Sequence, residues 1–306
     1  MVWGRWYFAV QSLAGAAWWV SVFLIPPVRQ ATLGTIDPTI AALLDVPLFV
    51  VASAIAAFGL RCAAFLATGW TILVTIALGA FAAVTGQAGA GAVLMIVAAV
   101  GSVVALALVS TGGIPRGWVA VGPFAFRSAD AGASVAAQLG RTGAEIVVFW
   151  GVFLGVIPAI LVFLERRWQV AIDVPAAWSP PLVGVGVGIL LLGSALGLWS
   201  AATMATRGNG TPLPSAMPNR LVVAGPYRFV RNPMALGSIA QGVGLGLALS
   251  SWMVVVYALC GAVLWNVVVR PVEERDLETR FGQSYGRYRD ELRCWLPTLR
   301  PLPATR

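Results

Sequence analysis

Residues 225–237 read GPYRFVRNPMALG, and residues 273–288 read EERDLETRFGQSYGRY. Between these stretches lies an apolar segment long enough for two helices, with little more than Ser250-Ser251 to turn the chain. Helices joined by so short a turn run antiparallel. We therefore expect the arginines of the first stretch and the glutamates of the second at the same end of a helical hairpin. Charged groups are costly in lipid and usually functional there, so this end is the candidate functional site.

The composition of the 306-residue chain is that of a polytopic integral membrane protein, with 59% hydrophobic and only 10% charged residues. Apolar runs of about 17 to 25 residues recur, which is the length of a helix that crosses a bilayer. The runs lack the alternation of transmembrane β-strands, so the predicted fold is an all-α helical bundle. We expect about eight transmembrane helices, near residues 7–25, 40–60, 63–83, 91–110, 144–164, 182–202, 234–250 and 252–269.

The chain is expected to have two parts. Residues 1–180 form an N-terminal transmembrane bundle to which the sequence assigns no role, because they offer little beyond apolar spans. Residues 181–306 hold the hairpin and a polar C-terminal tail. The first span is expected to stay in the protein as a membrane helix, since it is longer than a typical signal core and further spans follow it.

The arginines predict the orientation in the membrane. The chain has 20 basic residues, all of them arginine. An even number of spans places both termini on one side, together with most of the arginine-bearing loops, and such loops are typically cytoplasmic. We therefore predict a multi-pass cell-membrane protein with both termini in the cytoplasm. The formal net charge of +8 is then a topology signal that suits anionic lipid headgroups, and no nucleic-acid partner is predicted.

The residue types exclude several chemistries. The chain contains no histidine, which excludes histidine-based nucleophile activation and histidine-ligated metal or haem. Cys62, Cys260 and Cys294 have no paired spacing, so neither a disulfide framework nor a zinc site is predicted and we expect these cysteines to serve packing. Chemistry must rest on arginine, carboxylate, tyrosine and backbone groups, or on a cofactor.

The stretch before the hairpin favours an anionic ligand. It is rich in glycine and proline, and a helix is expected to begin near Pro233. A helix N-terminus presents free N–H groups and partial positive charge. With Arg228 and Arg231 beside it, the helix start suits a carboxylate or a phosphate.

The far end of the hairpin is acidic. Four carboxylates lie within six residues, at Glu273, Glu274, Asp276 and Glu278. One interpretation is that they bind a cation. The other is ordinary pairing at i and i+4 on a surface helix, as for Asp276 with Arg280.

The region from about Leu221 to Pro297 resembles the cofactor domain of the isoprenylcysteine carboxyl methyltransferases and the related phospholipid N-methyltransferases. Those enzymes combine an Arg-His-Pro-x-Tyr-x-Gly helix start with a later Glu-Glu, then Phe-Gly-x-x-Tyr-x-x-Tyr and a closing proline. The matching residues here are Arg231, Pro233 and Gly237, then Glu273 and Glu274, then Phe281, Gly282, Tyr285, Tyr288 and Pro297. The chain departs from the pattern at Asn232, where the family has histidine, and at Ala235, where it has tyrosine.

The resemblance implies a membrane methyltransferase that binds S-adenosyl-L-methionine. The expected cofactor-binding residues are Gly225, Tyr227, Arg231, Asn232, Pro233, Gly237, Glu273 and Glu274, and the expected catalytic residues are Arg231 and Glu274. We predict that Glu273 or Glu274 holds the amino group or the ribose of the cofactor, and that Arg231 holds a carboxylate of the cofactor or the acceptor. No metal site is predicted.

The acceptor and the reaction remain open at this point. A lipophilic acceptor would enter sideways from the bilayer, and a prenylated thiol or carboxylate, a phospholipid, a quinone-like lipid and a hydrophobic amine all fit. Two other functions compete with methyl transfer. One is an NADPH-dependent membrane reductase of the sterol-reductase kind, and the other is a non-catalytic transporter or scaffold.

Overall fold

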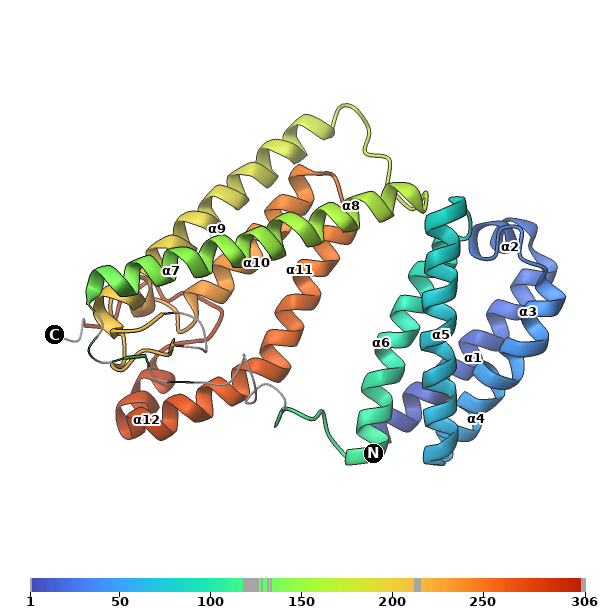
Figure 1. The fold of residues 1–306 in the computed structure, drawn as a ribbon, viewed down its shortest axis with the longest axis horizontal. Helices are drawn as coiled ribbons and strands as arrows, with labels where there is room; N and C mark the ends of the chain where they lie inside the picture. Colours follow the sequence, from blue (N-terminus) through green and yellow to red (C-terminus); the bar gives the residue numbers. More distant parts are fainter. Residues whose placement is uncertain are drawn as a thin grey trace. The chain divides into compact units, whose positions relative to one another are not determined.

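The computed structural model of the protein describes residues 2–117, 127, 129, 130, 132, 134–211 and 216–303. All the regular elements in these residues are helices (Figure 1), which confirms the all-α class. The chain divides into two compact units. The first comprises Met1–Pro115 with Phe163–Ala171, and the second comprises Arg116–Val162 with Ile172–Arg306.

The first unit is a bundle of apolar helices. Its elements are α1 (Val2–Leu24), α2 (Pro26–Thr32), α3 (Pro38–Asp45), the π-helical segment η1 (Val46–Val51), α4 (Ala52–Ala57), α5 (Arg61–Thr85) and α6 (Gly89–Thr111). Helix α1 packs on α4 and α6, and α5 packs on α6. The segments α3, η1 and α4 follow one another without a break, as a single helix of 20 residues.

Buried polar side chains join the helices of this unit. The Gln11 amide donates to the Ser53 hydroxyl at 3.0 Å, and its carbonyl accepts from the Ser102 hydroxyl at 2.8 Å. All three side chains are buried. Because a bilayer core offers no water, such groups must bond to one another, and these contacts link α1 to α4 and α6.

Asp45 is held in the same way. Its two carboxylate oxygens accept from the indole N–H groups of Trp19 and Trp70, each at 2.8 Å. Both oxygens therefore have partners, which accounts for an acidic side chain in an apolar helix without assigning it a further role.

The second unit contains the hairpin. Its elements are α7 (Val135–Trp150), the π-helical segment η4 (Gly151–Val156), the start of α8 (Ile157–Arg167), α9 (Ser179–Gly208), the 3₁₀ turn η6 (Gly225–Arg228), α10 (Pro233–Ala248), α11 (Trp252–Leu264), the π-helical segment η7 (Trp265–Val269) and α12 (Arg270–Glu291). Helix α10 lies along α9 and packs on α11, and α7 packs on α9. Figure 1 shows α11 continuing into α12.

Seven helices in the described residues are long and apolar enough to cross a membrane. The remaining predicted span, at residues 234–250, falls on the shorter apolar helix α10 (Pro233–Ala248), so the prediction of about eight spans is close. The 16 residues of α10 rise about 24 Å, which is less than the roughly 30 Å of a bilayer core. The orientation of the termini stays a prediction.

Glycines bring α9 and α10 into close contact. A Cβ atom at Gly193 would lie 2.8 Å from the Gly237 carbonyl oxygen and 2.9 Å from the Gln241 backbone nitrogen. Residues without side chains let membrane helices approach in this way. Because α10 begins at Pro233, two residues after Arg231, this contact holds the helix start that carries the arginine.

We expect Gly193→Ala to destabilise the protein by about 1–3 kcal/mol, because the added methyl group overpacks a backbone contact. Gly188→Ala is the matched control on the same helix, since a Cβ there meets nothing within 4 Å. Thermal unfolding of the detergent-purified variants measures the difference. Equal melting temperatures for the two variants would contradict the close contact.

Candidate functional site

The two ends of the hairpin meet as the sequence predicts. Arg231 Nη1 lies 3.0 Å from Glu274 Oε1. The intervening helices are antiparallel, because Gly242 of α10 faces Ala258 of α11 while Gly246 faces Val255. The arginine before α10 and the glutamate in α12 are thereby brought to one level.

Local sequence fixes the start of α10. The Asn232 side-chain oxygen accepts from the Ala235 backbone N–H at 2.9 Å, which is a helix N-cap, and Pro233 occupies the first helical position. The cap uses the acceptor half of the Asn232 amide. The NH₂ half can donate a hydrogen bond, but it cannot take up a proton as the family histidine can.

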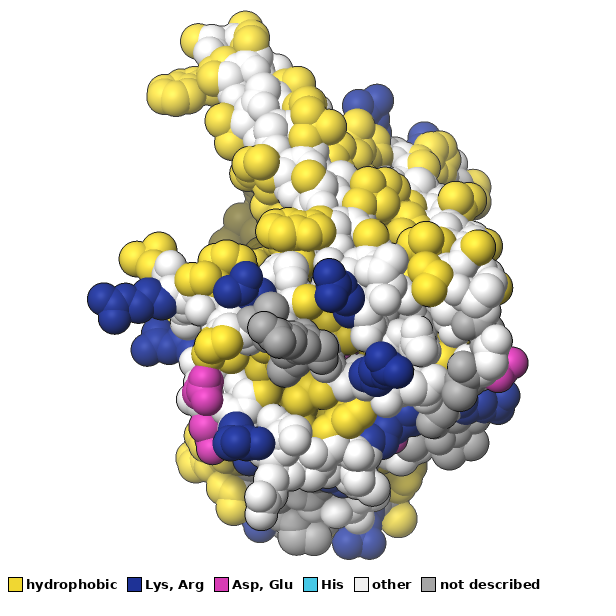
Figure 2. All heavy atoms as spheres, turned by 90° about the vertical axis from the view of Figure 1, so that its left-hand side faces the viewer, with side chains coloured by type: hydrophobic (Ala, Val, Ile, Leu, Met, Phe, Trp, Pro, Cys, Tyr) yellow, Lys and Arg dark blue, Asp and Glu magenta, His cyan; other side chains and the backbone are white. Residues whose placement is uncertain are grey.

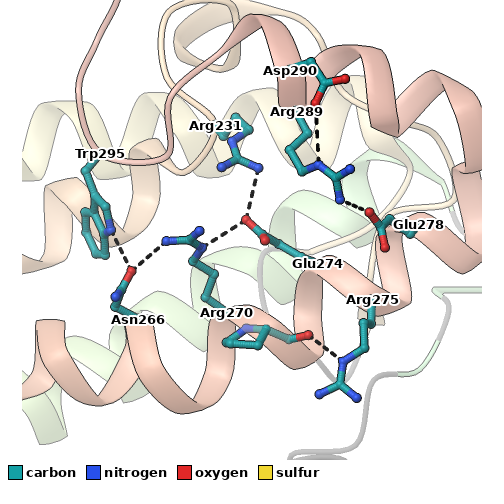
Figure 3. A network of polar contacts seen from close by, with 10 residues as sticks. Arg231, Asn266, Arg270, Glu274, Arg275, Glu278, Arg289, Asp290 and Trp295 are labelled. Carbon is teal, nitrogen blue, oxygen red and sulfur yellow. Dashed lines mark hydrogen bonds and ion pairs between the residues drawn. The ribbon is translucent and has the colours of Figure 1, made fainter.

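Glu274 lies between two arginines (Figure 3). Its Oε1 atom faces Arg231 Nη1 and also accepts from Arg270 Nε at 3.0 Å. Arg270 Nη1 in turn donates to Asn266 Oδ1 at 2.8 Å, and the same oxygen accepts from Trp295 Nε1 at 3.0 Å. Two guanidinium groups on one carboxylate leave a net positive charge, which suits an anionic group of a ligand.

Glu273 differs from its neighbour Glu274. No hydrogen bond or ion pair reaches Glu273 from the residues that the structure describes. The side chain nevertheless lines the same cavity as Glu274. Glu274 is therefore balanced within the protein, whereas Glu273 is the carboxylate that remains available to a ligand.

A cavity lies between the two ends of the hairpin. Its volume free of atoms is about 780 Å³, which includes space open to solvent. Charged residues form one part of its wall, namely Arg220, Arg231, Arg270, Glu273 and Glu274. Apolar residues form much of the rest, among them Met204, Met217, Met234, Leu277 and Phe281. Figure 2 views the second unit from the end at which α12 lies, where apolar side chains show between dark-blue arginines.

Five of the eight residues predicted to bind a cofactor line this cavity. They are Tyr227, Arg231, Asn232, Glu273 and Glu274. The two residues predicted to be catalytic, Arg231 and Glu274, are in direct contact.

The other three predicted residues, Gly225, Pro233 and Gly237, lie outside the lining of the cavity. Gly225 has a φ of +52°, in the left-handed region that favours glycine, and a Cβ there would lie 2.7 Å from Thr203 Oγ1. Gly237 faces Gly193 on α9, and Pro233 is buried at the start of α10. These residues shape the backbone around the cavity.

The tyrosine motif closes the cavity from the side of α12. The helix is interrupted at Gly282, whose φ of 51° and ψ of −129° are not helical. Beyond this kink, the Tyr288 hydroxyl donates to the Tyr227 carbonyl at 2.8 Å, and Tyr285 and Tyr288 are buried with Val223. Burial raises the pKa of the Tyr227 hydroxyl well above its ordinary value, so this hydroxyl stays protonated at neutral pH.

The C-terminal tail is the part of the site that sequence reasoning missed. The backbone N–H of Arg231 donates to the Arg293 carbonyl at 3.1 Å, and the N–H of Thr298 donates to the Phe229 carbonyl at 2.8 Å. These hydrogen bonds hold the tail beside the start of α10 and bring Cys294 into the lining of the cavity. Burial raises the pKa of the Cys294 thiol, which keeps the thiol protonated.

Arg270 and Asn266 were also missed, although the sequence carried a signal for them. Asn266, Arg270 and Glu274 are spaced by four residues, which places them on one helix face. For Trp295 there was no such signal, because its contact with Asn266 joins residues 29 positions apart.

Two further acidic residues of α12, Asp276 and Glu278, form ion pairs with arginine. Asp276 pairs with Arg280 at 2.8 Å in the i, i+4 arrangement that the sequence predicted, and Glu278 pairs with Arg289. Among the residues that the structure describes, no group of three or more histidine, cysteine, aspartate or glutamate side chains could hold a metal ion.

Part of the chain is similar in sequence to known proteins. Residues 182–284 match the family model of the phospholipid methyltransferases, a range that covers α9 to α11 and the first part of α12. A segment of 152 residues is 29% identical to the "Cobalt-zinc-cadmium resistance protein CzcN" of Cupriavidus metallidurans. This match covers 49% of the chain and 62% of the relative, so the chain spans about three fifths of the length of that protein. No solved structure matches the chain.

We expect Tyr288→Phe to cost about 1–3 kcal/mol of stability, because the buried Tyr227 carbonyl loses its hydrogen bond. Tyr257→Phe is the control, since the Tyr257 hydroxyl makes only an exposed contact of 3.4 Å and its removal should change little. Thermal unfolding of both variants checks the difference. A Tyr288→Phe protein as stable as the unsubstituted protein would contradict a role for this hydrogen bond in the site.

Proposed function

We propose that the protein is a membrane methyltransferase that binds S-adenosyl-L-methionine in the cavity of its second unit and methylates a lipophilic acceptor. The observation that carries the proposal is the charged wall of the cavity, where Arg231, Arg270 and Glu274 are paired while Glu273 is left without a partner among the described residues. The match of residues 182–284 to the phospholipid methyltransferases supports the same function.

The charges suit the two ends of the amino-acid part of the cofactor. Its ammonium group, or a ribose hydroxyl, would bind the Glu273 carboxylate. The carboxylate of the cofactor would bind Arg231 and Arg270. These two arginines carry two positive charges, whereas Glu274 between them carries one negative charge. The Nε atom of Arg231 is buried and has no hydrogen-bond acceptor in the described part of the chain, so it is a donor available for this purpose. The NH₂ group of Asn232 is a further donor.

The residues of the site need to supply little acid–base chemistry. When bound, the cofactor supplies a methyl group on a sulfonium, whose C–S bond breaks as the new bond to the acceptor forms. The protein aligns the two partners and excludes water, which are the main contributions to a displacement of this kind. Residues of α12 and of the tail, among them Phe281, Tyr285 and Cys294, form the part of the lining that would contribute to this exclusion.

The acceptor is best described by its apolar character. Methionine, leucine and phenylalanine side chains line the cavity beside the charged wall, and methionine adapts its shape to different apolar partners. An ionised carboxylate or thiolate reacts without a base, whereas an ammonium group must first lose a proton. The absence of histidine in the chain therefore favours O- or S-methylation over N-methylation.

Calorimetric titration of the detergent-purified protein with S-adenosylhomocysteine tests cofactor binding. We expect binding, and we expect Glu273→Gln to weaken it by about tenfold or more, because hydrogen bonds to charged groups contribute about 1.5–3 kcal/mol. Glu278→Gln is the matched control, since Glu278 pairs with Arg289 and does not line the cavity.

The same titration separates the competing functions. No heat from S-adenosylhomocysteine would contradict the proposal. Binding of NADPH in its place would favour a membrane reductase, and binding of neither ligand would favour a transporter or scaffold.

A methylation assay with membrane lipid extract and labelled cofactor tests the acceptor. We expect the label in a product that partitions into organic solvent, in an amount that falls with Glu273→Gln and not with Glu278→Gln. Label confined to water-soluble products would contradict a lipophilic acceptor.

A further inference from the structure

Asn266 connects the C-terminal tail to the charged wall of the cavity. Its side-chain oxygen accepts two hydrogen bonds, one from Arg270 Nη1 at 2.8 Å and one from Trp295 Nε1 at 3.0 Å (Figure 3). Arg270 and Glu274 line the cavity, whereas Asn266 and Trp295 do not. The hydrogen bond from Arg270 is therefore the direct contact between Asn266 and a residue that lines the cavity.

The position of Asn266 in the helix suits this connection. It lies in the π-helical segment η7 (Trp265–Val269), between α11 and α12. Such widened turns are frequent at functional sites. With Asn266, Arg270 and Glu274 spaced by four residues, their side chains form a continuous row of hydrogen bonds that leads to the cavity.

Arg270 depends on Asn266 for its orientation. Its guanidinium group is fixed at two atoms, Nη1 on Asn266 and Nε on Glu274. The pair with Glu274 is partly exposed, with 29% and 22% of the two side chains accessible, and an isolated pair of this kind contributes little. Without the Asn266 oxygen, the long side chain would regain rotamer freedom.

Three consecutive residues of the C-terminal tail contact the site or the residues that hold it. The Arg293 carbonyl accepts from the Arg231 backbone, Cys294 lines the cavity, and Trp295 bonds Asn266. The Trp295 ring also packs edge-on against Trp265, with ring centroids 5.1 Å apart. The tail thus contacts two of the three arginines of the charged wall, Arg231 directly and Arg270 through Asn266.

We propose that Asn266 is a positioning residue, which, tied to the tail by Trp295, holds Arg270 and Glu274 in the geometry that binds the cofactor. The identity of the ligand rests on the proposed function above. The tie, by which we mean the hydrogen bond from Trp295 to Asn266, rests only on the contacts of these two residues.

The ligand test compares three variants. Asn266→Leu keeps a similar volume and removes the acceptor, Asn266→Asp keeps an acceptor oxygen, and Trp295→Phe keeps an aromatic ring and removes the donor. We expect Asn266→Leu to weaken S-adenosylhomocysteine binding by about fivefold or more, with a raised KM for the cofactor and a smaller change in kcat. Asn266→Asp should restore binding to within about twofold. The positioning role would be overturned if Asn266→Leu and Asn266→Asp both lost binding of S-adenosylhomocysteine, or if Asn266→Leu lost thermal stability without losing affinity.

A second measurement tests the tie without any ligand. In a Cys62→Ala, Cys260→Ala background, Cys294 is the remaining cysteine, and its buried thiol should react slowly with a maleimide. We expect Asn266→Leu and Trp295→Phe to speed this reaction several-fold, and Asn266→Asp to leave it slow. Unchanged rates in the first two variants would overturn the tie. If the unsubstituted protein bound no S-adenosylhomocysteine, the proposed function would fail, while faster labelling would still support the tie.

Discussion

The ion pair between Arg231 and Glu274 is the interaction on which the site depends, because it joins two segments that the apolar hairpin would otherwise only bring near each other. Three features of the fold bring Arg231 and Glu274 together. The short turn between α10 and α11 returns the chain, the glycine contact between α9 and α10 holds the arginine end, and the π-helical segment η7 leads into the charged helix α12. In a chain with so few charged residues, arginines and carboxylates gathered around one cavity are a concentration of costly groups. Their shared location is the main reason to regard the second unit as the functional one.

The two adjacent glutamates have different surroundings, and this difference gives the cavity its chemistry. Glu274 shares one oxygen between two arginines, so its charge serves to orient them. Glu273 has no such partner in the described part of the chain and is free to meet a cation. A ligand with a positive and a negative group a few bonds apart, as in an amino acid, would find a partner for each. The apolar wall beside these groups is the feature that supports the proposal of a lipophilic acceptor.

The tail completes the site from the far end of the chain. The Arg231 N–H donates to the Arg293 carbonyl and the Thr298 N–H donates to the Phe229 carbonyl, and this packing brings Cys294 into the lining of the cavity. The hydrogen bonds of Tyr288 and Trp295 hold these segments together. In the first unit, by contrast, the side chains of Gln11 and Asp45 are hydrogen-bonded to other side chains of the same unit.

The sequence by itself determined the helical class, the approximate spans and the meeting of Arg231 with the adjacent pair Glu273 and Glu274. Long apolar runs can satisfy their backbone in lipid only as helices, and a two-residue turn leaves two helices no arrangement but antiparallel. The i, i+4 spacing indicated the pair of Asp276 with Arg280 as one of two interpretations of the acidic cluster, and the structure contains this pair. Only the tertiary structure decided which glutamate is paired, that Asn232 caps α10, and that Gly225 and Gly237 serve backbone packing while Tyr227 lines the cavity. It also decided the contact of Trp295 with Asn266. These outcomes depend on how the tail and α9 pack against the hairpin, and no local periodicity encodes contacts between segments so far apart in the chain.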